Sequence, residues 1–146
     1  DLEEILRLML IGSNNYMANQ VFLEVGARRL GPPVSLEKSL EVAREMLANL
    51  DVADEMQLVG GSGISRDNRF TAQGLAAVLD RFAPHAELLT ESRRGSRYKT
   101  GTFSGVRTLA GYARTTDHGD ARFVISLKEG GGQLRFELLE MIERGL

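Results

Sequence analysis

The spacing of apolar residues predicts helices in the first half of the chain. Apolar side chains recur three or four positions apart over about 2–11, 17–30 and 36–50. Polar residues at 12–15 separate the first two stretches, and Gly31-Pro32-Pro33 ends the second. A fourth helix is expected between Thr71 and Pro84. The side chains suited to cap three of these helices are Asp1, Ser35 and Thr71.

The pattern changes to strands from about Arg97. Strand-like runs cover 98–103, 106–115 and 122–127, with turns expected at Ser104-Gly105 and at 117–120. Such short connections favour an antiparallel meander. An amphipathic helix is expected after the break at 130–132. The sequence therefore predicts an α/β fold of the α+β type, in which helices pack against an antiparallel sheet.

Composition narrows the possible functions. The chain has 146 residues, 42% of them hydrophobic and 26% charged, which is typical of one globular domain. A formal net charge of -2 gives no reason to expect nucleic-acid binding. There is no cysteine, no cluster with metal-ligand spacing and no phosphate-binding loop, so no metal or other cofactor is expected. No apolar run reaches about 18 residues, so no transmembrane segment is expected either.

The triplet Lys99-Thr100-Gly101, followed by Thr102, is the most informative candidate site. A cation and two hydroxyls on one strand are suited to a substrate carboxylate, because charged and hydroxyl donors bind anions. The glycine would let an extended substrate lie against the strand edge. The alternative interpretation is a surface lysine beside an ordinary glycine bulge.

A second candidate is Ser13-Asn14-Asn15, in the turn between the first two helices, where simple helix capping is the alternative. An S-x-N turn and a later K-T-G strand are two of the three elements of the penicillin-interacting serine enzymes. The segment 60–66, GGSGISR, resembles the D-G-S-G-L-S-R segment of one branch of that group. The chain thus resembles the D-alanyl-D-alanine carboxypeptidase/endopeptidases of the class C penicillin-binding proteins, from about residue 5 to about residue 128.

The resemblance implies a role for each matching residue. Ser13 would relay a proton to the leaving amine, and Asn15 would bind the substrate's peptide amide. Lys99 would supply a positive field beside Ser13. Thr100 and Thr102 would hold the terminal carboxylate of D-Ala-D-Ala, and the Thr102 N–H would be one of two oxyanion-hole donors.

The resemblance also implies substrate and location. The expected partners are a peptidoglycan stem peptide ending in D-Ala-D-Ala and β-lactam inhibitors, and Gly101 must remain small to admit them. The expected reaction is serine-type peptide cleavage through an acyl-enzyme. The family acts outside the cytoplasmic membrane, so a periplasmic or cell-surface location is expected.

Two features depart from the family pattern. Its nucleophile belongs to an S-x-x-K element before S-x-N, yet the first twelve residues contain no serine. The literal match Ser35-Leu36-Glu37-Lys38 comes after S-x-N and is interpreted as structural. Gly60 stands where the family has aspartate, which puts a structural bond in doubt. Three arginines before K-T-G would attract an acidic peptide or form a solvated loop: Arg93, Arg94 and Arg97.

Two hypotheses follow. In the first, residues 1–146 are the C-terminal portion of a longer serine D,D-peptidase domain, inactive alone because the nucleophile lies upstream. Such a fragment would expose an apolar face, through which it would form a homodimer. In the second, the chain is a non-catalytic module that binds peptidoglycan or a protein through a degenerate site.

Overall fold

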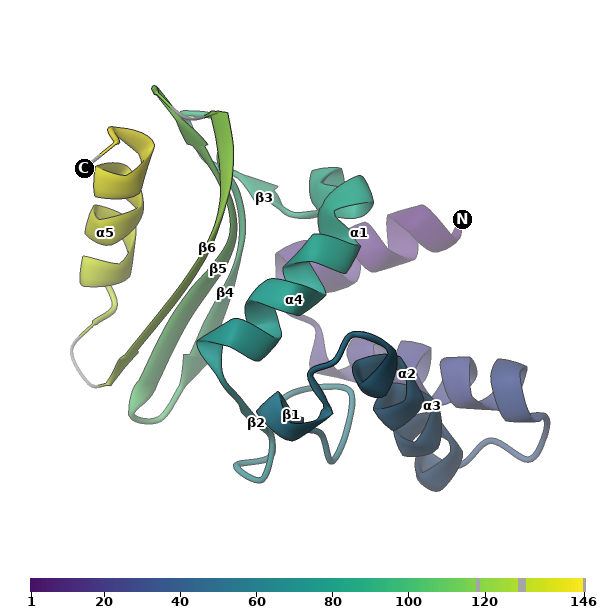
Figure 1. The fold of residues 1–146 in the computed structure, drawn as a ribbon. Coiled ribbons are helices and arrows are strands. Elements are labelled where there is room, and N and C mark those ends of the chain that lie inside the picture. Colours follow the sequence, from purple (N-terminus) through teal and green to yellow (C-terminus); the bar gives the residue numbers. More distant parts are fainter. Residues whose placement is uncertain (118, 129–130, 146) are drawn as a thin grey trace. The chain divides into compact units, whose positions relative to one another are not determined.

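The computed structural model describes residues 1–117, 119–128 and 131–145. The chain forms two compact units, Asp1–Ala77 and Val78–Leu146. Unit 1 consists mainly of helices, whereas unit 2 contains an antiparallel sheet with a helix along one face (Figure 1). The expected α+β fold class is therefore confirmed.

The helices of unit 1 begin and end close to the predicted positions. They are α1 (Leu2–Gly12), α2 (Asn15–Leu30), α3 (Leu36–Asn49) and α4 (Ala72–Phe82), of which α4 crosses into unit 2. The three expected caps are confirmed. The Asp1 carboxylate accepts from the Glu4 amide at 2.9 Å, the Ser35 hydroxyl from the Lys38 amide at 3.3 Å, and the Thr71 hydroxyl from the Gly74 amide at 3.0 Å.

Helices α2 and α3 pack closely because small residues meet between them. A Cβ at Gly26 would lie 2.5 Å from Ser39 Oγ and 2.6 Å from the Ser39 backbone nitrogen. Ser39 is almost fully buried, as are Ala43 and Leu47 on the same face of α3. Glycine at position 26 therefore sets how near the two backbones approach.

Several short elements were not predicted from the sequence. They are η1 (Ala53–Glu55), β1 (Met56–Gln57) and β2 (Arg69–Phe70) in unit 1, and η2 (Ala83–Leu88) and β3 (Thr90–Glu91) in unit 2. Strands β1 and β2 pair with each other, and β3 pairs with β4. Elements of two to six residues are too short to show a hydrophobic period, so only pairing in the folded chain defines them.

The meander is confirmed as β4 (Arg97–Phe103), β5 (Val106–Thr115) and β6 (Gly119–Lys128), in the sheet order β3-β4-β5-β6. The turn expected at 117–120 was too long. Gly119 and Asp120 already belong to β6, because they continue its ladder with β5 as far as Thr115. Of the expected turn and break residues, 118 and 130 lie outside the described part of the chain.

The core of unit 2 lies between β5, β6 and the closing helix α5 (Leu134–Glu143). Its buried members are Leu109, Ala113, Phe123, Ile125 and Leu139. Tyr98 of β4 meets Phe136 of α5 edge to face, with ring centroids 5.9 Å apart. The helix thereby holds the β4 strand, which carries the K-T-G triplet, as well as β5 and β6.

A buried carboxylate anchors the last turn of α5 to the segment before β4. Glu143 is 3% exposed and accepts from Ser96 Oγ at 2.6 Å and from Ser92 Oγ at 3.1 Å. Glu143→Ala should lower the free energy of unfolding by about 2–4 kcal/mol, because it removes two charge-assisted bonds and leaves two hydroxyls unsatisfied. Urea unfolding would measure this change. Glu140→Ala is the control: its exposed pair with Arg144 is worth less than about 1 kcal/mol. Equal losses in both variants would contradict the anchoring role.

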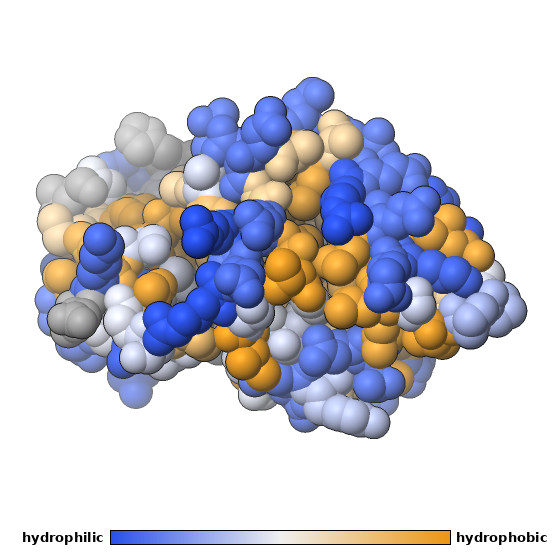
Figure 2. All heavy atoms as spheres, turned by 90° about the horizontal axis from the view of Figure 1, so that it is seen from below, coloured by the Kyte–Doolittle hydropathy of each residue, from blue (hydrophilic) through white to orange (hydrophobic). Residues whose placement is uncertain are grey.

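Apolar side chains reach the surface in several places, as Figure 2 shows for one face. Helix α1 has no buried residue, and Leu2, Leu8 and Ile11 are more than half exposed. Dimerisation through such a face stays a prediction. Among the described residues, no helix has both the length and the apolar character needed to cross a membrane.

Candidate active site

The S-x-N turn joins α1 to α2 in unit 1. Ser13 ends α1 with φ 48° and ψ 45°, a left-handed conformation that few residues other than glycine adopt. Asn14 caps α2: its side-chain oxygen accepts from the Met17 amide at 3.0 Å. Asn15 is the first residue of α2 and is exposed.

Within the S-x-N motif, the residue that caps α2 is the middle one, Asn14. Asn14 performs the capping that was the alternative explanation for the whole triplet. Ser13 is the C-cap of α1, and its backbone N–H donates to the Leu10 carbonyl at 3.4 Å. Capping explains the conformation of Ser13 but gives no role to its hydroxyl or to the Asn15 side chain. A left-handed residue is common where a helix ends, and Asp51 after α3 has the same sign of φ. The turn therefore retains its two candidate residues, both exposed.

The glycine-rich segment 60–66 packs on α2, the helix that begins at the S-x-N turn. A Cβ at Gly61 would lie 2.4 Å from Phe22 Cβ and 2.9 Å from the Ala18 carbonyl oxygen. Asn68 closes the loop, since its side-chain oxygen accepts from the Val59 amide at 2.9 Å. Nothing lies within 4 Å of a Cβ at Gly60, so this position does not require glycine.

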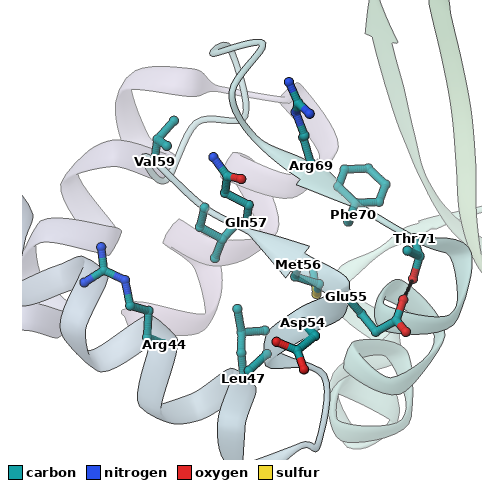
Figure 3. Close-up of a pocket in the computed structure, with 12 residues that line it drawn as sticks. Arg44, Leu47, Asp54, Glu55, Met56, Gln57, Val59, Arg69, Phe70 and Thr71 are labelled. Atoms are coloured by element: carbon teal, nitrogen blue, oxygen red, sulfur yellow. Dashed lines mark hydrogen bonds between the residues drawn. The ribbon is translucent and has the colours of Figure 1, made fainter.

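Two hollows in unit 1 are not lined by Ser13 or Asn15. The larger has a volume of about 700 Å³ and lies between α3 and the β1–β2 pair, with Arg44, Gln57 and Arg69 among its lining residues (Figure 3). The smaller, of about 510 Å³, lies between α2 and the glycine-rich loop. In the larger one, the Thr71 hydroxyl donates to the Glu55 carboxylate, a contact that joins the residue after β2 to η1.

In unit 2, the K-T-G triplet lies on β4 where one side of the strand is open. Strand β3 pairs only with Arg97 and Tyr98, so the β4 edge at 99–103 has no partner strand in the described chain. Phe103 and Val106 form the closing pair of the β4–β5 hairpin. Counting back along an antiparallel ladder from this pair, the N–H and C=O of Thr100 and Thr102 point away from β5. An extended peptide could pair with backbone groups along this edge, although the Thr100 carbonyl already accepts from the Lys99 ammonium.

Side chains along this edge have contrasting exposures. Lys99 is half-buried, and its ammonium donates to the Thr100 carbonyl at 2.8 Å. Thr102 is exposed. A Cβ at Gly101 would lie 2.1 Å from Thr108 Oγ1, so even alanine there would displace a neighbour. Position 101 therefore requires a small residue because Thr108 on the neighbouring strand leaves no room for a Cβ.

A second cation lies close to Lys99. Burial lowers the pKa of the Lys99 ammonium, and the nearby positive charge of Arg135 lowers that pKa further. Arg135 extends from α5, and its Nη1 donates to the Gly101 carbonyl at 2.8 Å and to the Thr108 carbonyl at 3.0 Å. Both effects weaken the hold of Lys99 on its proton.

Arg135 was not identified as a candidate from the sequence. A signal was present, however: Arg135, Leu139 and Glu143 are four residues apart, so they share one face of α5, and all three are buried. Charged residues in line with a core leucine indicate buried polar contacts. Among described residues, no group of three or more acidic or histidine side chains is arranged to hold a metal ion.

Two of the three arginines before K-T-G have acidic partners. Arg94 lies 3.6 Å from Glu143 and Arg97 lies 3.0 Å from Glu91. These pairs favour a structural role for Arg94 and Arg97 over attraction of an acidic peptide.

The Ser35-x-x-Lys38 match has the geometry of a helix start. Lys38 Nζ donates to the Gly31 carbonyl at 2.6 Å and to the Pro33 carbonyl at 3.1 Å. The Ser35 hydroxyl accepts from the Lys38 amide. The ammonium is therefore engaged with the preceding loop, in agreement with the structural interpretation of this match.

Residues 1–94 match the model of the D-Ala-D-Ala carboxypeptidase 3 (S13) family. The chain belongs to this family. A curated relative, the carboxypeptidase DacB of Mycolicibacterium smegmatis, is 31% identical, and the match covers 75% of this chain and 30% of that protein. The chain thus spans about a third of the length of this curated relative.

Solved structures share the fold of this S13 chain. Penicillin-binding protein 4 (dacB) of Haemophilus influenzae, solved with a β-lactam, superposes with a TM-score of 0.84 at 20% identity, covering 98% of this chain and 42% of the other. A predatory endopeptidase of Bdellovibrio bacteriovorus, solved with an immunity protein, gives a TM-score of 0.73 at 19% identity, covering 97% and 42%. The expected family and fold are both confirmed.

The site residues form two groups. Ser13 and Asn15 lie in the turn of unit 1, whereas Lys99, Thr100, Gly101 and Thr102 lie on one strand of unit 2, joined by Arg135. Within each group the motif residues are next to one another. The roles that the resemblance implies for them stay predictions, and their use in a single site is part of the proposal below.

Proposed function

We propose that this chain supplies the S-x-N and K-T-G walls of the active site of a serine D-Ala-D-Ala carboxypeptidase or endopeptidase that cleaves peptidoglycan stem peptides. The observation that carries the proposal is the K-T-G triplet at the open edge of β4, in a chain of the S13 family. The nucleophilic serine would come from a part of the longer protein outside these 146 residues. A periplasmic or cell-surface location belongs to the same proposal.

In the proposed reaction, the substrate's C-terminal part lies along the β4 edge. The serine oxygen attacks the carbonyl carbon of the D-Ala-D-Ala bond, and the Thr102 N–H stabilises the developing oxyanion. Ser13 relays the proton released by the attacking serine hydroxyl to the amine of the leaving D-Ala as the C–N bond breaks, and Asn15 holds the peptide amide. Water then hydrolyses the ester and regenerates the serine. Lys99 favours the negative charge that develops at each step.

The full-length protein provides the direct test. It should be labelled covalently by fluorescent penicillin and should release D-Ala from a peptide ending in D-Ala-D-Ala. The competing function is a module that binds peptidoglycan or a protein without turnover. A full-length protein that lacks an upstream S-x-x-K element, and that is neither labelled nor active, would support that module instead.

The isolated 146-residue chain should not be labelled by fluorescent penicillin. Its S-x-x-K match has its ammonium bound to two carbonyls and therefore has no base poised at the Ser35 hydroxyl. Intact-mass spectrometry after incubation would check this, with Ser35→Ala as the matched control. A stable adduct on wild-type chain that Ser35→Ala abolishes would show that Ser35 is a nucleophile.

A further inference from the structure

The smaller hollow of unit 1, between α2 and the glycine-rich loop, has a lining without formal charge among the described residues. Its polar lining consists of amides and hydroxyls, including Asn19, Gln20 and Ser62, and its apolar lining includes Phe22 and Ile64. The larger hollow, by contrast, is lined by two arginines and two acids. A charged ligand would lose its water in the smaller hollow without gaining a counter-charge. The lining is therefore suited to a neutral ligand rich in hydrogen-bonding groups.

Two side-chain amides on α2 are available to such a ligand. Asn19 and Gln20 are exposed, and neither side chain is hydrogen-bonded to a described residue. Each amide can donate two hydrogen bonds and accept others. Phe22 lies one turn further along the helix and is half-buried. Free amides beside an aromatic ring suit a sugar, which carries hydroxyls around its edge and C–H groups on its faces.

The hollow lies along α2 from the S-x-N turn. Asn15, Asn19 and Phe22 are four and three residues apart, so they share one side of the helix. Asn15 is the residue proposed to hold the substrate's peptide amide, and the helix rises about 10 Å from Asn15 to Phe22. A stem peptide of four residues spans up to about 14 Å. A sugar joined to the far end of the stem peptide would therefore reach the hollow.

Gly60 leaves the hollow open and uncharged. It is part of the lining, and nothing lies within 4 Å of a Cβ built there. Gly60 is also not among the described glycines with positive φ, so a side chain would not strain its backbone. Aspartate, which the family pattern has at this position, would fit and would bring a carboxylate to the hollow. The neutral lining thus depends on a residue in which this chain departs from that pattern.

We propose that this hollow binds the N-acetylated disaccharide to which the stem peptide is attached, which is the uncharged part of peptidoglycan. The inference rests on the proposed function and adds to it a glycan subsite, none of whose lining residues has a role in the chemistry. Asn19 and Gln20 would hydrogen-bond to the acetamido and hydroxyl groups, and a sugar face would lie on Phe22. The stem peptide, with its carboxylates, would lie outside the hollow.

The test compares two substrates of the full-length protein: a disaccharide-linked peptide ending in D-Ala-D-Ala, and the same peptide without the sugars. The wild type should cleave the disaccharide peptide with a kcat/KM about 10-fold higher, mainly through a lower KM. Gly60→Asp should remove most of this preference and leave kcat/KM for the free peptide within about twofold. Replacing Asn19 and Gln20 together with alanine should reduce the preference in the same way. Gln73→Ala, an exposed amide on α4 that lines neither hollow, is the matched control and should preserve it.

Equal kcat/KM values for the two substrates in the wild type would overturn the inference while leaving the proposed function intact. A preference that survives both Gly60→Asp and the double alanine variant would also overturn it. If Gly60→Asp lowers both values alike, the double alanine variant decides.

If the wild-type protein cleaves neither substrate, the proposed function fails instead, and binding of the sugar alone then tests the inference. Isothermal titration of the full-length protein with di-N-acetylchitobiose would measure it. Binding that Gly60→Asp weakens about 10-fold and Gln73→Ala leaves unchanged would support the glycan subsite. No binding, or equal binding by all three proteins, would overturn it.

Discussion

Lys99→Ala should lower the rate at which full-length protein is acylated by penicillin by about 100-fold or more. The ammonium is half-buried beside Arg135, where solvent screens its field less than at an exposed position. Its removal would therefore withdraw stabilisation from the anionic transition state of acylation. Stopped-flow or gel-based labelling with fluorescent penicillin would measure the rate constant directly.

A matched lysine in the same sheet provides the control. Lys128 is the last residue of β6, is exposed and pairs in register with Val106. Lys128→Ala should leave the acylation rate within about twofold, because an exposed charge away from the open edge contributes little. An unchanged rate in Lys99→Ala would remove this lysine from the site.

Gly111→Ala should destabilise the protein by about 3 kcal/mol or more. Gly111 lies opposite Tyr98 in the β4–β5 ladder. A Cβ there would lie 2.0 Å from the Arg97 carbonyl oxygen and 2.8 Å from Tyr98 Cα. Both atoms belong to the backbone, so no side-chain rotation relieves the overlap, and the strand that carries K-T-G must move. Thermal or urea unfolding would measure the loss.

Gly132→Ala separates this overlap from the general effect of replacing glycine. Gly132 lies in the turn before α5, and nothing lies within 4 Å of a Cβ there. That variant should unfold within about 1 kcal/mol of the wild type. Similar stabilities for Gly111→Ala and Gly132→Ala would mean that β4 and β5 are not held as closely as the structure shows.

Most of the fold could be predicted from the sequence because its long elements have clear periods. Helix α3 and strand β5 each span ten or more residues with a regular pattern, and their limits differ from the expected ones by one residue or less. The short strand β3 could not be found in this way. It is defined by pairing with Arg97 and Tyr98, contacts that only the folded chain brings together.

The candidate site shows a similar division between local and long-range information. The motif residues Ser13 and Lys99 could be found because each motif is contiguous in the sequence. Arg135 could not be assigned to the site, since it reaches the Gly101 carbonyl 34 residues away in the sequence. Ser35-x-x-Lys38 shows the opposite case. Its spacing matches the S-x-x-K element, but its ammonium donates to a carbonyl of the preceding loop, which the sequence alone does not show.

The open edge of β4 also affects how readily this protein aggregates. An unpaired strand segment can add a strand from a second molecule as readily as it adds a peptide. Within 99–103, Lys99 carries the only formal charge, and two copies meeting at this edge would bring like charges together. The residue proposed to favour the substrate's negative charge would thus also discourage self-association. We therefore expect Lys99→Ala to aggregate at lower concentration than the wild-type chain.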